Sequence, residues 1–169
     1  QSRTATLALS MEGGGGFEIW QFTSRPTEKA AFDIQLGDYG LYVCRIKSRN
    51  VAASYNYFKE NGAEILGELA TTPNGEKTFF AKDPNGNIFN IVEGKGWFKN
   101  TNHPSNCGAV AGTMIGVSDI EKALPLYQEI LGYETVEYDE TGTFEDFGGL
   151  PAGNKKVRRI LLSHKNERR

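Results

Sequence analysis

Two polar residues stand between apolar neighbours in segments that otherwise have the composition of packed strands. Glu18 lies in GFEIWQF and Asn90 lies in NIFNIVEG, each between a phenylalanine and an isoleucine. Because successive side chains of a strand point to opposite faces, this pattern predicts a polar cleft on one face and an apolar core on the other. A carboxylate in such a cleft could act as a base, a ligand or a hydrogen-bonding anchor for substrate. The alternative for Glu18 is an ion pair with Arg45 or exposure beyond the sheet edge.

Two further residues have side chains suited to binding a small molecule. Arg45 could act as a fork for a carboxylate or phosphate group of a ligand, because its planar guanidinium donates two parallel hydrogen bonds. Its alternative is a structural ion pair. Trp20 could stack on a flat ligand, and its alternative is a place in the core.

Composition and charge exclude several classes of partner. The chain is 38% hydrophobic and 24% charged, which is ordinary for a soluble globular protein. Its formal net charge of −2 gives no field that would gather nucleic acid or anionic lipid. No apolar run approaches the roughly 20 residues that a membrane helix needs. Cys44 and Cys107 have no metal-binding or disulfide-frame spacing, so we expect reduced thiols and a cytoplasmic location.

An internal repeat organises these residues. The segments GLYVCRIKSRNVAASYNYFKENGAEIL and AGTMIGVSDIEKALPLYQEILGYETV each consist of a short apolar strand, a cap residue, a helix with one apolar stripe and a glycine. The predicted caps are Asn50 in the first copy and Ser118 in the second, where Ser118 and Glu121 have the spacing of a capping box. Pro125 should bend the second helix because it lacks a backbone donor.

Three short strand-like segments follow the first helix, and they complete a unit of one strand, one helix and three more strands. The tetrapeptide DPNG fits a type I turn and predicts a hairpin before the closing strand. The glycine run before Phe17 fits a hairpin turn and lacks the residues of a phosphate loop. We therefore expect residues 1–37 to hold the tail of a first unit and a connector, 38–94 a complete second unit, 95–107 a linker, and 108–169 an incomplete third unit.

This ordered repeat, with VSDIEKALPLYQEILGY opening one copy and DPNGN before the last strand of another, resembles the glyoxalase, bleomycin-resistance and extradiol dioxygenase superfamily, also called the vicinal oxygen chelate superfamily. The resemblance covers nearly the whole chain. It implies an α+β fold of tandem βαβββ modules, in which mixed sheets pair into an incomplete barrel around a cleft. The cleft usually holds one divalent metal that acts as a Lewis acid on vicinal oxygens of the substrate.

The resemblance also implies where metal ligands should stand, and most of those positions have changed here. The closing-strand glutamate of the family is present as Glu18 in the first unit and is replaced by Asn90 in the second. The ligand position of the opening strand falls on Val43 in the second unit and on Gly112 in the third. If units one and two pair, Glu18 is the one standard metal ligand left. The cofactor stays open, since a divalent metal would need ligands from outside this chain.

On the same pattern, the strand face that carries Val43, Arg45 and Asn90 points into the cleft. The opposite face packs under the helices, and we place on it Phe17, Ile19, Tyr42, Cys44, Ile46, Phe89 and Ile91. Val43, Arg45, Asn90 and Trp20 are therefore the predicted ligand-binding residues, and Glu18 is the predicted catalytic or metal-binding residue.

Three functions fit this reading. The first is a small-molecule protein with a degenerate metal site that binds or acts on a ligand in the cleft between paired modules. The second is a metal-dependent lyase, isomerase or dioxygenase whose remaining ligands come from missing segments. The third is a non-catalytic scaffold or dimerisation module. The half-built units predict pairing with a second copy or with missing segments of the same protein.

Overall fold

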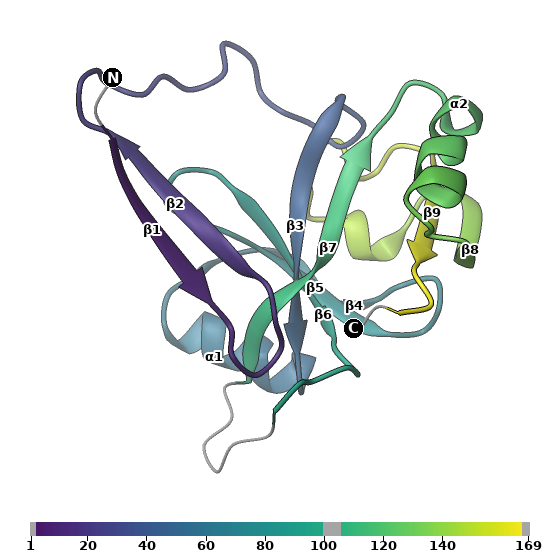
Figure 1. Cartoon of the computed structure of the whole chain (residues 1–169), viewed down its shortest axis with the longest axis horizontal. Coiled ribbons are helices and arrows are strands. Elements are labelled where there is room, and N and C mark those ends of the chain that lie inside the picture. Colours follow the sequence, from purple (N-terminus) through teal and green to yellow (C-terminus); the bar gives the residue numbers. More distant parts are fainter. Residues whose placement is uncertain (1–2, 100–105, 167–169) are drawn as a thin grey trace.

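A computed structural model describes residues 3–99 and 106–166, which form three sheets and a few short helices (Figure 1). No helix in these two ranges is long and apolar enough to cross a membrane. The strands are β1 (Arg3–Leu9), β2 (Gly16–Phe22), β3 (Gly40–Ser48), β4 (Glu64–Thr71), β5 (Lys77–Lys82), β6 (Ile88–Glu93), β7 (Cys107–Gly116), β8 (Thr135–Gly142) and β9 (Val157–Ser163). The helical segments are α1 (Val51–Glu60), α2 (Ile120–Pro125), the π-helical turn η1 (Leu126–Ile130) and the 3-10 turn η2 (Glu145–Phe147).

Residues 40–93 form one strand, one helix and three further strands, β3, α1, β4, β5 and β6. These strands lie in the order β4, β5, β6, β3, and β6 runs parallel to β3 and antiparallel to β5. The Asn50 side chain caps α1 by accepting a hydrogen bond from the Ala53 backbone at 3.0 Å, as the sequence predicted. The apolar side of α1 packs against the sheet, and its Val51 forms a core with Phe79, Ala81 and Ile91.

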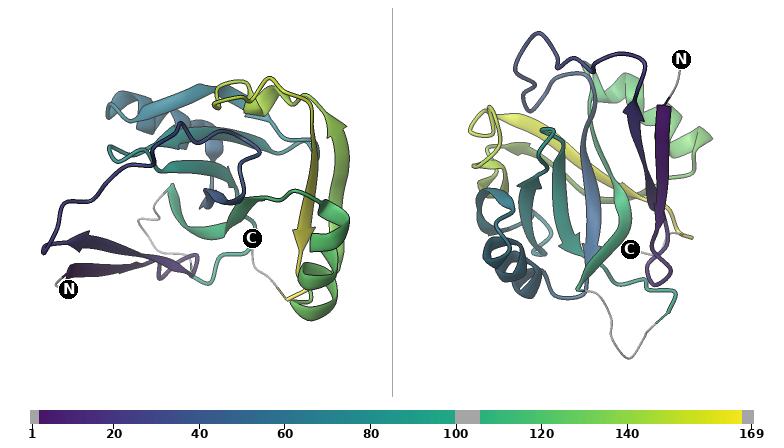
Figure 2. Two further views of the ribbon diagram at one scale, coloured as in Figure 1. Left: turned by 90° about the horizontal axis from the view of Figure 1, so that it is seen from above. Right: turned by 90° about the vertical axis from the view of Figure 1, so that its left-hand side faces the viewer.

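Units two and three share a sheet, whereas the sequence had suggested that units one and two pair. Strand β7 of the third unit lies antiparallel beside β3 and adds a fifth strand to the four strands of the second unit. The remnant of the first unit, the hairpin of β1 and β2, forms a separate two-stranded sheet. In both views of Figure 2 this hairpin lies beside the five-stranded sheet rather than within it. The shared cleft therefore has to be sought between units two and three.

The third unit departs from the second in its helix and its strands. Its helix is capped by Asp119, whose carboxylate accepts from the Lys122 backbone at 3.3 Å, so the predicted cap at Ser118 is wrong by one residue. Pro125 ends the α-helical part, and η1 continues with π-helical geometry, which accommodates the missing donor. Strands β8 and β9 pair only with each other within the described ranges.

The turn of the β1–β2 hairpin is attached to the second unit. The buried Lys47 ammonium donates to the carbonyl oxygens of Gly13 at 3.2 Å and Gly96 at 3.0 Å. A Cβ on Gly13 would lie 2.4 Å from the Cβ of Ala109, so this position needs glycine for close packing. The glycine run is thus a hairpin turn, as predicted, and also a contact surface. Within the predicted linker, Trp97 lies under the Arg49 guanidinium at 3.9 Å, and residues 100–105 lie outside the described residues.

The two faces of the five-stranded sheet carry different cores. We call the face of Val43, Arg45 and Asn90 the inner face and the face under α1 the helix face. The loop 143–153 of the third unit covers part of the inner face, where Phe147 and Leu150 pack against Val43 and Phe80. Phe89 and Ile91 lie on the helix face as predicted. Tyr42 was predicted to pack there too, but a register shift between β3 and β7 beside it places its ring against the inner-face core instead.

Candidate ligand site on the inner face

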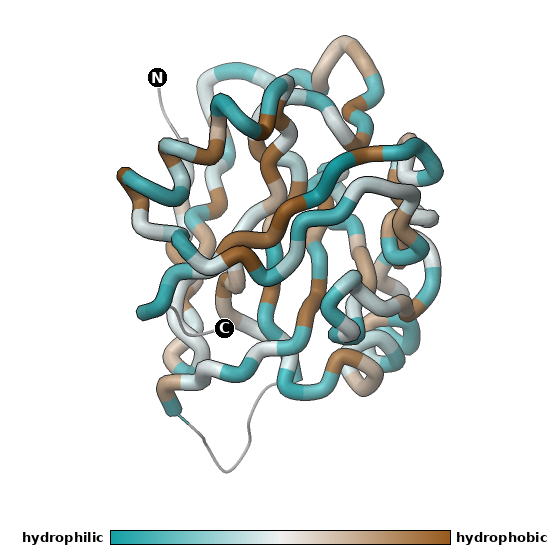
Figure 3. The backbone as a smooth tube through the Cα atoms, turned by 90° about the vertical axis from the view of Figure 1, so that its right-hand side faces the viewer, coloured by the Kyte–Doolittle hydropathy of each residue, from teal (hydrophilic) through white to brown (hydrophobic). Residues whose placement is uncertain are grey.

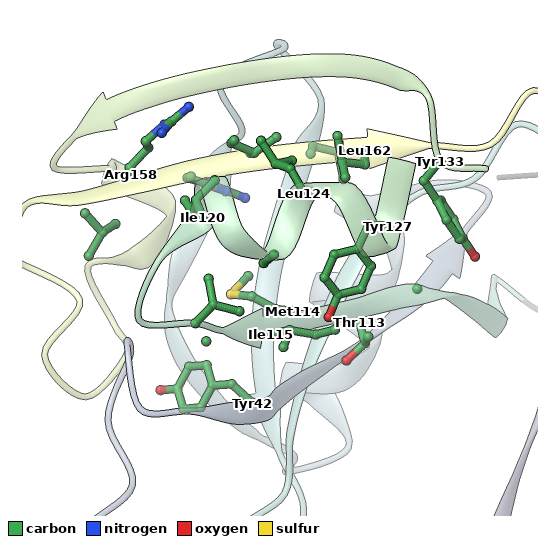
Figure 4. A pocket seen from close by; sticks show the side chains of 18 of the residues that line it. Tyr42, Thr113, Met114, Ile115, Ile120, Leu124, Tyr127, Tyr133, Arg158 and Leu162 are labelled. Carbon is green, nitrogen blue, oxygen red and sulfur yellow. The ribbon is translucent and has the colours of Figure 1, made fainter. Parts of the chain in front are cut away.

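A cavity of about 920 Å³ opens between the shared sheet and the third unit. Residues of β7, β9, α2 and η1 line it, and in Figure 4 the helical segments lie between the two strands. Tyr127 of η1 and Thr113 of β7 point toward one another across it. Its apolar wall includes Met114, Ile115, Ile120, Leu124, Leu131, Leu161 and Leu162. Figure 3 views the molecule from the side of α2 and β9 and colours these segments by hydropathy.

A buried polar network joins β3, β5 and β6 on the inner face. Arg45, which is 7% exposed and lines the cavity, donates through Nε to Oδ1 of Asn90 at 3.4 Å. The Asn90 side chain is fully buried, and its amide nitrogen donates to the Thr78 hydroxyl at 2.6 Å and to the Phe79 carbonyl at 3.2 Å. The Thr78 hydroxyl in turn donates a hydrogen bond to the Ile91 carbonyl at 3.0 Å. Asn90 therefore helps to orient the Arg45 side chain, which lines the cavity.

A second guanidinium, that of the half-buried Arg159, lies on the third-unit side of the same cavity. Arg159 binds Asp146 through both carboxylate oxygens, at 3.0 and 2.8 Å, and its guanidinium stacks over the Phe147 ring at 4.2 Å. Burial raises the pKa of Asp146, and the positive charges of Arg159 and Arg45 oppose that rise. Asp146 is thus paired directly with Arg159, and Arg45 contributes only its positive charge to the surroundings of this carboxylate.

The other predicted site residues fall in different places. Val43 lies on the inner face but is only 2% exposed and belongs to the core under Phe147. Glu18 and Trp20 lie exposed on β2, in the separate hairpin, and neither lines the cavity. Trp20 contacts Phe22 edge to face instead. Of the five predicted residues, the structure brings together Arg45, Asn90 and Val43, and it leaves Glu18 and Trp20 apart from them.

The residues at the family's ligand positions do not fit a metal. Gly112 lies opposite Arg45 in the register of β7 and β3 and offers no side chain. Asn90 uses its amide within the protein, and Glu18 belongs to another sheet. Throughout the described ranges, no group of three or more His, Cys, Asp or Glu side chains is placed to hold a metal ion.

Sequence reasoning missed Arg159 and Asp146. Both residues lie in the third unit, in a basic strand and a polar loop that have the composition of solvated surface. Only the pairing of β7 with β3 brings that loop over the inner face of the second unit. The one available signal was the apolar pair Phe144 and Phe147 flanking Asp146, which indicates a loop that packs.

Comparison with known proteins agrees with the fold. The family model of the Glyoxalase/Bleomycin resistance protein/Dioxygenase superfamily matches residues 2–91, which is more than half of the chain. The chain therefore belongs to this superfamily, and its α+β architecture of βαβββ units is the one predicted from the sequence.

Among solved structures, the chain is similar to glyoxalase I from Zea mays, with 18% identity and a TM-score of 0.49 over 98% of this chain and 56% of that chain. Two point mutants of the same enzyme give 17% identity with a TM-score of 0.49 and 19% identity with a TM-score of 0.44. The first covers 98% of this chain and 56% of that chain, and the second covers 79% and 46%. The chain spans about half the length of these structures. No curated protein matches it.

Proposed function

We propose that this protein binds a small organic anion at the inner face, between units two and three, without using the family's standard metal ligands. The anionic group lies at Arg45 and Arg159, and the apolar part of the ligand lies along the wall formed by β7 and the third unit. The observation that carries this proposal is that the guanidinium-bearing side chains of Arg45 and Arg159, one from each unit, both line the same cavity.

The electrostatics of the site favour an anion. Positive charge gathers at this wall, because Arg45 and Arg159 both line the cavity and a buried charge favours an opposite charge beside it. A carboxylate or phosphate on the ligand would accept charge-assisted hydrogen bonds from these guanidinium groups.

The site is also held rigidly, which reduces the cost of binding. Asn90 and Thr78 connect Arg45 to β5 and β6, and the rings of Tyr138, Phe144 and Phe147 surround Arg159. Side chains that are already ordered lose little freedom when a ligand arrives. The cavity volume of about 920 Å³ is within the range of roughly 300–1,000 Å³ typical of small-molecule sites.

The test is a titration by calorimetry with benzoate, phenyl phosphate and the neutral benzamide. We expect the two anions to bind more tightly than benzamide. The substitution Arg45→Met removes the charge and keeps most of the stem, so it should reduce this preference by about tenfold or more. Added salt should weaken the anions and leave benzamide unchanged.

Arg158→Met is the matched control. Arg158 also lines the cavity, but its guanidinium binds Asp139 at 2.9 and 2.8 Å and also pairs with Glu121 on α2. This variant should keep the preference for anions. Equal binding of benzoate and benzamide, or a preference that survives Arg45→Met, would contradict the proposal.

A further inference from the structure

We infer that Asp146 makes anion binding at the inner face depend on a proton. When its carboxylate is charged, it competes with the bound anion for the positive charge of Arg159. When it is protonated, that competition ends and the anion binds more tightly. The inference rests on the proposed anion site and adds its regulation, because anion and proton are taken up together and the anion is released as pH rises.

The first observation is how Asp146 contacts the guanidinium group. A single nitrogen of Arg159, Nη1, donates to both carboxylate oxygens, at 3.0 and 2.8 Å. The Arg159 side chain also lines the cavity, whereas Asp146 is 5% exposed and does not line it. The carboxylate therefore binds one end of the guanidinium from within the protein. A negative charge on Asp146 and a negative charge on a ligand in the cavity would act on the same guanidinium group.

The second observation is the set of charges around Asp146. Arg159 of β9, Arg45 of β3 and Tyr138 of β8 interact with it electrostatically. Burial raises the pKa of Asp146, and the charges of both arginines lower it. Burial also raises the pKa of Tyr138, so this phenol stays neutral where carboxyl groups titrate. Because arginines keep their charge in that range too, Asp146 is the group of these four that changes charge.

The charged groups on the other elements beside the loop are exposed. On β4, which packs against η2, Glu64 pairs with Lys82, and Glu68 accepts a hydrogen bond from the Tyr55 hydroxyl at 2.7 Å. Within the loop itself, Glu145 is exposed to water. Water screens an exposed charge, so neither β4 nor the rest of the loop, both fully described, supplies a second buried carboxylate.

The third observation is that the loop carrying Asp146 does not depend on the ion pair alone. Phe147 and Leu150 are buried and pack against the sheet, and the Leu36 backbone donates to the Pro151 carbonyl at 3.0 Å. These contacts do not involve the charge of Asp146, so the loop can stay in place when the carboxyl group is protonated. Burial favours the neutral form of a carboxyl group. The substitution Asp146→Asn, which is neutral and has the same shape, therefore represents the protonated state.

Proton binding and anion binding are then linked. An anion beside Arg159 raises the pKa of Asp146, because a second negative charge nearby disfavours the ionised carboxylate. By reciprocity, protonation of Asp146 raises the affinity for the anion by the same factor. The affinity should therefore rise as pH falls through the pKa of Asp146, and binding in that range should take up a fraction of a proton from solution.

The probe is benzenesulfonate, whose anionic group stays ionised throughout the titration of a carboxyl group. Calorimetry measures its binding to the whole chain from about pH 7 downward, over the range in which circular dichroism shows the chain to be folded. We expect the affinity to increase several-fold, up to about tenfold, over this range. The same titrations in buffers of different ionisation enthalpy measure the proton uptake, which a purely structural role of Asp146 would not produce.

Two substitutions in the same loop form a matched pair. Asp146→Asn should raise the affinity for benzenesulfonate at neutral pH by roughly tenfold and should abolish the proton uptake, because the competing charge is gone. Glu145→Gln removes one charge from the neighbouring exposed residue and should leave the affinity and the proton uptake unchanged. Both variants are first checked by circular dichroism to be folded. If Asp146→Asn does not fold, the proton uptake of the natural chain and of Glu145→Gln decides the question.

The outcomes separate this inference from the proposed function. Proton uptake that accompanies binding and is lost in Asp146→Asn, together with tighter binding by that variant, supports the inference. If the chain prefers benzenesulfonate to the neutral benzenesulfonamide but takes up no proton, or if Asp146→Asn binds no more tightly, the inference is overturned and the anion site stands. If neither the natural chain nor Asp146→Asn prefers the anion at any pH, the anion site is wrong and the inference falls with it.

Discussion

Units two and three both begin with a strand, a helix and two further strands, yet their cores differ. In unit two, β6 lies between β3 and β5, and α1 packs on Phe79 and Ile91. In unit three, the corresponding place is a cavity of about 920 Å³, and α2 has no buried residue. The difference shows that a helix stripe read from sequence fixes which side of a helix is apolar. Whether that side is buried depends on the strand that completes the sheet beneath it.

The largest expected effect separates the two cores directly. Phe79→Ala should lower the free energy of unfolding by about 3–5 kcal/mol, because Phe79 is 1% exposed and contacts Tyr55 and Phe58 of α1 edge to face. Leu124→Ala in unit three should cost under about 1 kcal/mol, since its side chain borders a cavity. Urea unfolding of both variants measures the difference. Equal losses would mean that unit three has a closed core after all.

A substitution at Asn90 tests what distinguishes the closing strand of unit two. Asn90→Asp restores the carboxylate of the family pattern beside Arg45 but removes the amide donor to Thr78 and Phe79. We expect a loss of about 1–3 kcal/mol near neutral pH, since a buried carboxylate would face the Phe79 carbonyl. Burial should raise the pKa of the new carboxyl group. Stability should therefore be present at low pH and fall as pH rises through that pKa.

Urea unfolding of Asn90→Asp across a pH series gives both quantities. If Asn90→Asp were as stable as the natural chain near neutral pH, the attraction between Arg45 and the new carboxylate would outweigh the hydrogen bonds lost with the amide. That result would strengthen the case for an anion beside Arg45.

Pro125 accounts for part of the irregularity of unit three. Pro125→Ala restores a backbone donor in the middle of the helix and should convert the π-helical turn of residues 126–130 to α-helix. We expect a gain of about 1 kcal/mol in the free energy of unfolding and a larger helical signal in circular dichroism. Because the turn would be rewound, Tyr127 should rotate away from Thr113. An unchanged helical signal would contradict this account of the π-helical turn.

The smallest expected effect concerns Tyr42 of β3, which packs against the core shared by units two and three. The Tyr42 hydroxyl is buried and has no hydrogen-bond partner among the described residues. Tyr42→Phe should therefore leave stability unchanged or raise it by up to about 1 kcal/mol. Burial, helped by Asp38, raises the pKa of Tyr42 to about 12 from 10.0. The stability that depends on its neutral form is complete below pH 10 and is lost as pH rises toward 12.

Alkaline unfolding curves of the natural chain and Tyr42→Phe test this pH dependence. The natural chain should lose more stability than the variant between these two pH values. Identical curves would mean that Tyr42 ionises without a penalty.

The sequence was a good guide to the second unit because its signals are local. Asn50 caps α1, Asp83 and Gly86 close the turn between β5 and β6, and the alternation around Asn90 assigns the two faces of β6. Each of these signals acts over a few residues. The resemblance to the superfamily added the order of the strands.

The candidate site was harder to predict because it depends on contacts between units. The pairing of β3 with β7 has no local signature, and two register shifts beside Arg45 and Ile46 bend β7 in a way that no periodicity records. That pairing brings Asp146 and Arg159 to Arg45 and leaves Glu18 on another sheet. The capping error at Asp119 is smaller, since Ser118 and Asp119 are both good cap residues and only one can be used.

The attachment of the hairpin at its turn also has a consequence for local opening. Glu12 and Gly13 hold the turn through Arg49, Phe98 and Lys47. By contrast, the side chains of residues 4–9 are exposed. The hairpin should therefore stay attached at its turn and open most readily at the other end of its two strands. Amide hydrogen exchange should be slowest near Ser10 and Gly15 and should quicken steadily along both strands toward Thr4 and Gln21. Proteases would then trim the hairpin from its open end while the turn stays bound to the second unit.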